Sequence, residues 1–252
     1  MKRLIQNFLL ILQFMTRLPL NINLPCERED FRRGLALFPL VGLIIGTIQW
    51  IVFYLLFRNM PNLIIAVIVV LIGVLITGAL HIDGLGDTCD GFFAFKGKER
   101  IIEIMKDSRI GTYACIAIIM DLFFKVAAIA SINTAYDSVI IIVAPVVSRA
   151  STVLLSFIGK PAKSNGSGNL YISNVGKLQL AMAALLAFVI TILLIGIPKA
   201  VAIIIIVLII TFSFNFLCNR KINGLTGDTL GANNELVEII IFLVFIYLYR
   251  TH

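Results

Sequence analysis

The sequence predicts an all-α fold: a polytopic membrane bundle of six or seven transmembrane helices, with an interfacial helix at the N-terminus. Hydrophobic residues make up 60% of the 252-residue chain and charged residues only 14%. Apolar runs of about 20 residues, the length that crosses a bilayer, recur along the chain. Because short links without Pro- or Ser-rich spacers join these runs, residues 1–252 are expected to form one domain.

Residues 1–18 are predicted to form an amphipathic helix that lies in the membrane interface. Lys2 and Arg3 precede an apolar stretch, as they would in a signal peptide. Polar residues interrupt that stretch, however, and the sequence Thr-Arg-Leu-Pro at 16–19 stands where a small-residue cleavage site would be expected. An uncleaved interfacial helix fits this pattern better than a signal peptide.

The apolar runs that follow are the predicted spans. Six are long enough to cross a bilayer, at residues 35–57, 62–80, 112–132, 138–158, 177–197 and 199–218. A seventh run, 236–249, is shorter. It is expected either to span by local thinning of the bilayer or to enter as a re-entrant segment.

The distribution of Lys and Arg predicts the orientation. These residues gather in the N-terminal region and in three loops, 81–111, 159–177 and 219–235, whereas the opposite loops hold only Arg58, Lys199 and Arg250. By the positive-inside rule the three basic loops should face the cytoplasm of a cell-membrane protein. The net charge of +7 then reflects topology and contact with the anionic lipid bilayer, and no nucleic-acid partner is expected.

Three aspartates follow the second predicted span, in the segment 81–91 (HIDGLGDTCDG). On a helix, Asp83, Asp87 and Asp90 would share one face, because they are four and three residues apart. Clustered carboxylates at an apolar boundary repel one another unless a cation lies between them. The alternative is a polar start of a helix with solvated acids.

A bound cation at this segment should be Mg²⁺, with Mn²⁺ as the second possibility. The ligands are oxygens, and Cys89 and His81 lie off the acidic face of the helical wheel, which argues against zinc. Magnesium commonly shares its coordination with substrate phosphates. The segment therefore predicts phosphoryl-transfer chemistry on a diphosphate.

Two further segments on the same side carry residue types that could bind a phosphate or a metal ion. In 106–112 (KDSRIGT), Arg109 offers a planar fork for phosphate, and Ser108 and Thr112 offer hydroxyls beside the start of a helix. Helix capping with a snorkelling arginine is the alternative. In 224–235, Asp228 and Glu235 are seven residues apart on one helical face, and glycines allow close approach of a ligand or another helix.

The loop 159–176, which contains Gly-Ser-Gly and two lysines, is interpreted as a flexible link or lid without chemistry.

Within the spans, Asp121 and Arg149 are predicted to lie at matching depth, about 13 Å from the cytoplasmic end of their helices. Because buried charges are usually paired, a cross-helix ion pair between them is expected, with Lys125 as a competing partner of Asp121.

Taken together, these motifs resemble the cobalamin synthases, the adenosylcobinamide-GDP ribazoletransferases of late vitamin B12 assembly. The resemblance covers essentially the whole chain and rests on 16–19, 81–91, 106–112, Arg149 and 224–232. It implies a multi-span, magnesium-dependent membrane enzyme that joins adenosylcobinamide-GDP to α-ribazole, or to its 5'-phosphate, and releases GMP. An expected Arg-Pro motif is replaced by Gly-Lys-Pro-Ala-Lys at 159–163. A homo-oligomer is left open.

The resemblance also implies roles for individual residues. The metal ligands would be Asp83, Asp87 and Asp90, completed from another helix by Asp228, with Glu235 as a further candidate. The diphosphate or the departing GMP would be bound by Arg109, Lys106 and Arg17, with Ser108, Thr112, Thr226 and Arg149 as additional contacts. The general base would be Asp107, Asp228 or His81, and a structural role for His81 is equally open.

Two other functions were weighed. A CDP-alcohol phosphotransferase also clusters aspartates at the end of a membrane helix, but its pattern of two aspartates three apart, Ala-Arg, a glycine and two aspartates four apart is not reproduced here. An ion-coupled transporter could use the intramembrane charges Asp121, Lys125 and Arg149. The chain shows no internal repeat, however, and its acidic cluster lies at a membrane end.

Overall fold

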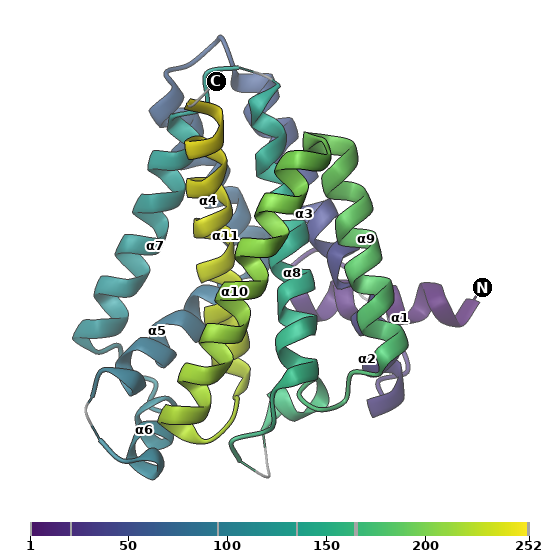
Figure 1. The fold of residues 1–252 in the computed structure, drawn as a ribbon, viewed down its shortest axis with the longest axis vertical. Helices are drawn as coiled ribbons and strands as arrows, with labels where there is room; N and C mark the ends of the chain where they lie inside the picture. The colour runs from purple at the N-terminus through teal and green to yellow at the C-terminus, as the bar shows by residue number, and fades with distance from the viewer. Residues whose placement is uncertain (1, 21, 95, 135, 164–165, 251–252) are drawn as a thin grey trace.

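The protein is a bundle of long helices that run side by side, with short helices gathered at one end (Figure 1). The computed structural model describes residues 2–20, 22–94, 96–134, 136–163 and 166–250. Over these residues the chain is helical and forms no strand; an isolated bridge pairs Pro161 with Leu225. The predicted all-α fold is therefore confirmed.

The helices follow one another in this order: α1 (Lys2–Met15), α2 (Arg28–Gly34), η1 (Leu35–Leu37), α3 (Phe38–Leu56), α4 (Asn62–Thr77), α5 (Leu80–Phe92), α6 (Lys98–Ile104), α7 (Thr112–Ala130), η2 (Asp137–Val139), α8 (Ile140–Ile158), η3 (Ser167–Leu170), α9 (Lys177–Ile195), α10 (Ile197–Ile222) and α11 (Gly227–Arg250). Among the described residues, six helices are long and apolar enough to cross a membrane, or seven when α4 and α5 are counted together as one broken span. This number agrees with the predicted multi-pass bundle.

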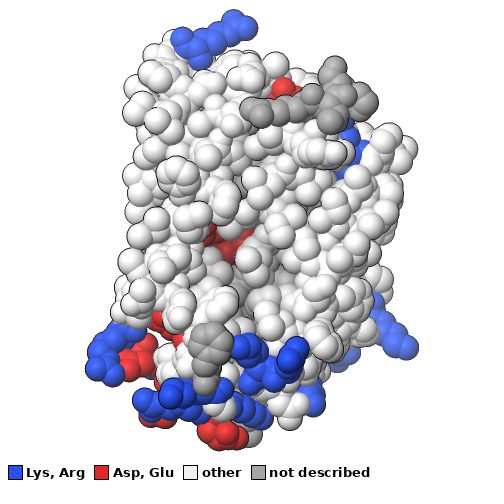
Figure 2. Space-filling view, turned by 60° about the vertical axis from the view of Figure 1, so that its left-hand side comes forward, with Lys and Arg blue, Asp and Glu red and all other residues white. Residues whose placement is uncertain are grey.

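The basic loops meet at one end of the bundle. The turns before and after α6, between α8 and α9, and between α10 and α11 lie at the same end in Figure 1. Figure 2 shows most of the visible Lys and Arg gathered at that end, below a surface of mostly uncharged side chains with a small acidic patch in its middle. The three predicted basic loops, two of which were predicted to carry the active site, are thus on one side of the protein, which we call the basic end.

The last helix differs from the expectation. The predicted short run 236–249 is part of α11, a helix of 24 residues that begins at Gly227. Its first turns contain Asn233, Asn234 and Glu235, which lower the hydropathy of the segment yet are buried. Because α11 packs against α5, α7, α8 and α10, these polar side chains face other helices instead of lipid.

A sharp bend separates α4 from α5. The predicted span 62–80 ends at Thr77, and the chain then turns by 89°. Gly78 and Ala79 both have left-handed backbone conformations, with φ of 61° and 60°. A left-handed residue at the end of a helix redirects the chain. The bend sends α5 across the basic end of the bundle and away from the direction of α4.

The N-terminal helix α1 lies across the long helices (Figure 1). It is amphipathic: Leu10, Ile11 and Met15 are buried in the core, whereas Leu4 and Ile5 are exposed. Its placement in a membrane interface stays a prediction that suits the exposed apolar residues.

Candidate active site at the basic end

Three aspartates project from α5, as the sequence predicted. Asp83 is exposed, and Asp87 and Asp90 are partly buried. The start of α11 packs directly on the backbone of this helix at Gly84. There is no room for a side chain at this contact, since a Cβ added at Gly84 would lie 2.7 Å from the carbonyl oxygen of Asp228. This close contact brings Asp228 near enough to Asp83 and Asp87 for the carboxylates to repel one another.

The segments 81–91 and 106–112 meet around a polar cavity. Its volume is about 250 Å³, and its charged or hydroxyl lining residues are Asp83, Asp87, Lys106, Asp107, Ser108 and Arg109. The cavity therefore places carboxylates and cations side by side. This combination can hold a phosphate together with a metal ion.

Arg109 and Asp107 bind each other in the loop. The Arg109 guanidinium donates hydrogen bonds to the Asp107 carboxylate, at 2.6 Å from Nη2 to Oδ2. Hydrogen bonding by Arg109 lowers the pKa of Asp107 to about 2. A carboxylate with so low a pKa is a weak base, so Asp107 could act as general base only after Arg109 has left it.

Asp90 caps the next helix. Its Oδ2 accepts a hydrogen bond from the backbone N–H of Gly111 at 2.6 Å, and its Oδ1 accepts one from Ala114 at 2.8 Å. The free N–H groups at the start of α7, which could otherwise bind a phosphate, are thus partly occupied by this carboxylate. Thr112, at the same helix start, is exposed.

Two further predicted contacts have local structural partners. Thr226 is buried, donates a hydrogen bond from its hydroxyl to Asp228 at 3.1 Å, and accepts one from the backbone N–H of Thr229. It therefore orients Asp228 at the start of α11. Arg17 is exposed and lies with its side chain against Gly78, at the bend between α4 and α5.

The loop 159–176 is packed against the site, which corrects its interpretation as a flexible link. Its backbone pairs with Leu225 through Lys160 and Ala162, both at 2.8 Å, and Gly168 lies against the backbone of Gly227. Lys163, to which the sequence analysis gave no role, is near enough to Asp228 to attract its charge. Lys163 comes near Asp228 because the loop pairs with Leu225. A single sequence does not reveal such a pairing, so it gave no signal for this lysine.

Comparisons with known proteins show the family to which the chain belongs. A family model described as Cobalamin-5-phosphate synthase matches residues 7–246. The chain belongs to the cobalamin-5-phosphate synthase family. The chain is 54% identical to the adenosylcobinamide-GDP ribazoletransferase of Clostridium kluyveri, over 95% of this chain and 96% of the relative. It is 52% identical to that of Clostridium tetani, over 97% of each chain. No solved structure matches. The predicted family and the prediction of a transferase are confirmed.

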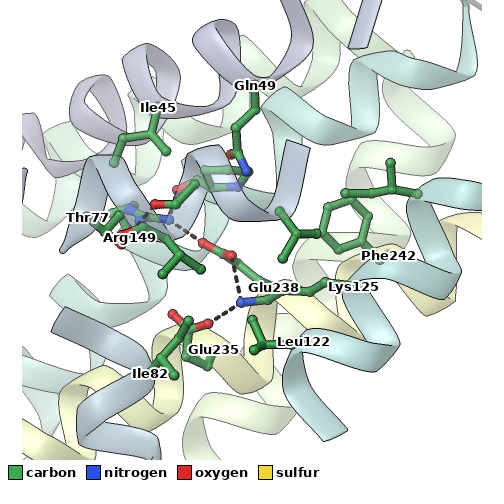
Figure 3. A pocket seen from close by; sticks show the side chains of 15 residues that line it. Ile45, Gln49, Thr77, Ile82, Leu122, Lys125, Arg149, Glu235, Glu238 and Phe242 are labelled. Carbon is green, nitrogen blue, oxygen red and sulfur yellow. Dashed lines mark hydrogen bonds and ion pairs between the residues drawn. The ribbon is translucent and has the colours of Figure 1, made fainter. Parts of the chain in front are cut away.

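This cobalamin-5-phosphate synthase family member also holds a buried charge cluster inside the bundle, which Figure 3 shows from close by. Glu238 lies between two cations: it pairs with Arg149, and its other oxygen lies 3.4 Å from the Lys125 ammonium. Lys125 also pairs with Glu235, and with Asp121 at 3.2 Å. The cluster therefore joins α7, α8 and α11.

The cluster corrects the intramembrane prediction. The expected ion pair between Asp121 and Arg149 is wrong, because Asp121 pairs with Lys125 on its own helix and Arg149 pairs with Glu238. Glu238 was not among the residues predicted from the sequence. Glu238 is three residues from Glu235, so both acids lie on one helical face. This spacing could have indicated that Glu238 belongs to the same buried cluster.

Arg149 and Glu235 thus lie away from the polar cavity of this family member. Glu235 is seven residues beyond Asp228, which is about 10 Å along an α-helix. Both residues are buried in the charge cluster. Their predicted contacts with substrate or metal have no support in this arrangement.

The carboxylates at the basic end suit magnesium. Within the described residues, no three His, Cys, Asp or Glu side chains are already arranged to hold a metal ion. Magnesium, however, usually keeps several waters and takes one or two carboxylates together with substrate phosphates. Asp83, Asp87 and Asp228 supply oxygen donors whose mutual repulsion a cation would relieve. The donor set therefore fits.

Proposed function

We propose that the protein is a magnesium-dependent transferase of the cell membrane that joins adenosylcobinamide-GDP to α-ribazole, or to its 5'-phosphate, and releases GMP. The relatives carry the name adenosylcobinamide-GDP ribazoletransferase. The observation that carries the proposal is a polar cavity at which Asp83 and Asp87 of α5 meet Lys106 and Arg109, with Asp228 of α11 packed beside these acids.

Asp83, Asp87 and Asp228 would hold the metal ion in this reaction. Bound Mg²⁺ would neutralise the negative charge that builds up on the leaving phosphate. Asp90 is a weaker candidate ligand because both of its oxygens already accept hydrogen bonds from α7. Glu235 leaves the set because it pairs with Lys125 in the buried cluster.

The cations of the polar cavity would bind the diphosphate. Lys106 is exposed and supplies a point charge. Arg109 would exchange its bond to Asp107 for a bidentate bond to phosphate, which suits the guanidinium geometry. Both residues thereby hold the two phosphorus atoms next to Asp83 and Asp87.

The reaction exchanges one phosphorus–oxygen bond for another. The hydroxyl oxygen of ribazole forms a bond to the phosphorus that carries cobinamide, the bond from this phosphorus to the GMP oxygen breaks, and GMP leaves with the electron pair. The hydroxyl proton must pass to a base. Asp107, Asp228 and His81 all remain candidates, because the Arg109 bond that makes Asp107 a weak base would be given up when Arg109 binds phosphate.

The experiment that tests the function is an assay of GMP release by the lipid-reconstituted protein. GMP should form from adenosylcobinamide-GDP only when α-ribazole and Mg²⁺ are both present, and without any ion gradient. GMP release that does not depend on ribazole would contradict a transferase. A requirement for an ion gradient would favour the transporter instead.

A further inference from the structure

A second cavity lies beside the polar one and differs from it in chemistry. It has a volume of about 130 Å³ between α1, α3, α5, η3 and α11, and its lining includes Phe14, Phe38, Tyr171, His81, Asp83 and Asp228. We call it the aromatic cavity. Asp83 lines both cavities, so they meet at the proposed metal site.

The walls of this cavity suit a flat ring. Tyr171 is the centre of an aromatic group, with its ring centroid 5.4 Å from that of Phe14 and 5.9 Å from that of Phe38. Aromatic rings at such distances stack or meet edge to face. The aromatic cavity is slightly smaller than the dry cavity of about 150 Å³ that holds benzene in another protein, so a flat base larger than benzene would enter it only in part, with the rest of the base at the entrance.

Two buried polar atoms on the cavity walls have no partner among the described residues. They are Nδ1 of His81 and the hydroxyl oxygen of Tyr171, on side chains that are only 6% and 5% exposed. A buried polar atom without a hydrogen bond is costly and rare. Burial raises the pKa of Tyr171, so its hydroxyl stays protonated and can donate. Because His81 and Tyr171 both line the cavity, a ligand there with an aromatic body and polar groups could supply the missing partners.

We propose that the aromatic cavity binds the acceptor nucleoside by its flat base, so that its ribose hydroxyl reaches Asp83 and Asp228 from the side opposite the diphosphate. This inference rests on the proposed function and assigns the acceptor subsite within it. Phe14, which is 42% exposed, lies at the entrance. The cobinamide macrocycle is too large for a cavity of about 130 Å³.

The other flat base in the reaction is guanine. Its edge carries several donors and acceptors, which would be left unpaired among apolar walls. The methylated benzimidazole base of ribazole is mostly apolar and has few polar groups to pair. The aromatic cavity thus fits ribazole better than the guanine of the donor.

Tyr171→Phe tests the subsite because it removes one oxygen and keeps the ring. The binding constant of α-ribazole, measured by calorimetry on the lipid-reconstituted protein, should weaken about tenfold, as expected for one lost hydrogen bond. The KM for α-ribazole should rise by a similar factor, and the KM for adenosylcobinamide-GDP should not change. Thermal stability without ligand should stay equal or rise, because the hydroxyl has no partner there.

Two further variants sharpen the test. Phe14→Ala, at the entrance, should also weaken ribazole binding selectively. Tyr54→Phe, on an exposed tyrosine of α3 that stacks on Trp50, is the matched control and should change neither constant. Unchanged ribazole binding in Tyr171→Phe and Phe14→Ala would overturn the subsite, and selective weakening of GMP binding would assign the cavity to guanine instead. Because ribazole binding is measured without turnover, a failure of the subsite is distinguishable from a failure of the proposed transferase reaction.

Discussion

Gly84 on α5 touches the backbone of Asp228 on α11, so that even one methyl group at position 84 would lie 2.7 Å from the carbonyl oxygen of Asp228. Backbone cannot move aside as the tip of a side chain can. The contact therefore fixes the distance between the acids of α5 and the acid at the start of α11.

Gly84→Ala should separate the two helices and lower turnover by at least tenfold, while the protein remains folded and in the membrane. The matched control is Gly86→Ala on the same helix, where the new methyl would meet the flexible end of Ile118 at 3.1 Å. Gly86→Ala should keep most of the activity in the GMP-release assay. Equal effects of the two substitutions would contradict the role of the Gly84 contact.

Asp83→Asn, Asp87→Asn and Asp228→Asn should each lower turnover by orders of magnitude. Each change keeps the shape of the side chain but removes a charge that would hold Mg²⁺. Turnover should be measured as a function of magnesium concentration, with circular dichroism as the control for folding. Near-normal rates at saturating magnesium would refute the proposed metal site.

Asp90→Ala should lower stability as well as activity, unlike the changes at the other aspartates. It leaves the N–H groups of Gly111 and Ala114 without their carboxylate partner, and loss of a helix cap costs about 1 kcal/mol. Thermal unfolding of the detergent-solubilised protein measures this loss. Asp83→Ala, at an exposed position, serves as the comparison and should unfold like the unmodified protein.

The basic end should face the cytoplasm. In a background without native cysteines, Glu99→Cys at that end should be protected from an impermeant thiol reagent in intact cells and labelled after permeabilisation. Asn59→Cys, at the opposite end, should be labelled in intact cells. Both positions are exposed. The reverse labelling pattern would place the proposed active site outside the cell.

The buried pair Arg149 and Glu238 should show energetic coupling. Glu238→Gln should destabilise the protein by about 3–5 kcal/mol because it leaves Arg149 without its ion-pair partner, whereas Arg149→Met should cost less because Glu238 keeps Lys125 at 3.4 Å. The double variant should cost clearly less than the sum of the two. Unfolding in a denaturing detergent gives the three values, and strictly additive losses would argue against a direct pair.

The acidic helix was predictable, whereas the start of α11 was not. The spacing of Asp83, Asp87 and Asp90 follows the helical period, so the sequence alone predicts their common face. Hydropathy places the last span at 236–249 because Asn233 and Asn234 count as polar, although both are fully buried against other helices. A hydropathy scale cannot distinguish a polar residue in a protein interior from one in water.

The side-chain partners across helices could not be predicted from the sequence either. Arg149 was expected to meet Asp121 because the two lie at similar depth, but depth does not say which neighbour a helix faces. The aromatic cavity combines Phe14 and Tyr171, which are far apart in the chain and show no common pattern. Such contacts are set by packing of the whole bundle.

The bend at Gly78 and Ala79 determines how the acids of α5 are spread relative to the long helices. On a helix that continued straight from α4, the seven residues from Asp83 to Asp90 would be spread over about 10 Å along the bundle axis. Since α5 is turned by 89° from α4, its acids lie across the bundle instead, at nearly one level along that axis. One hydrated ion could then contact an acid of α5 and the acid at the start of α11 together.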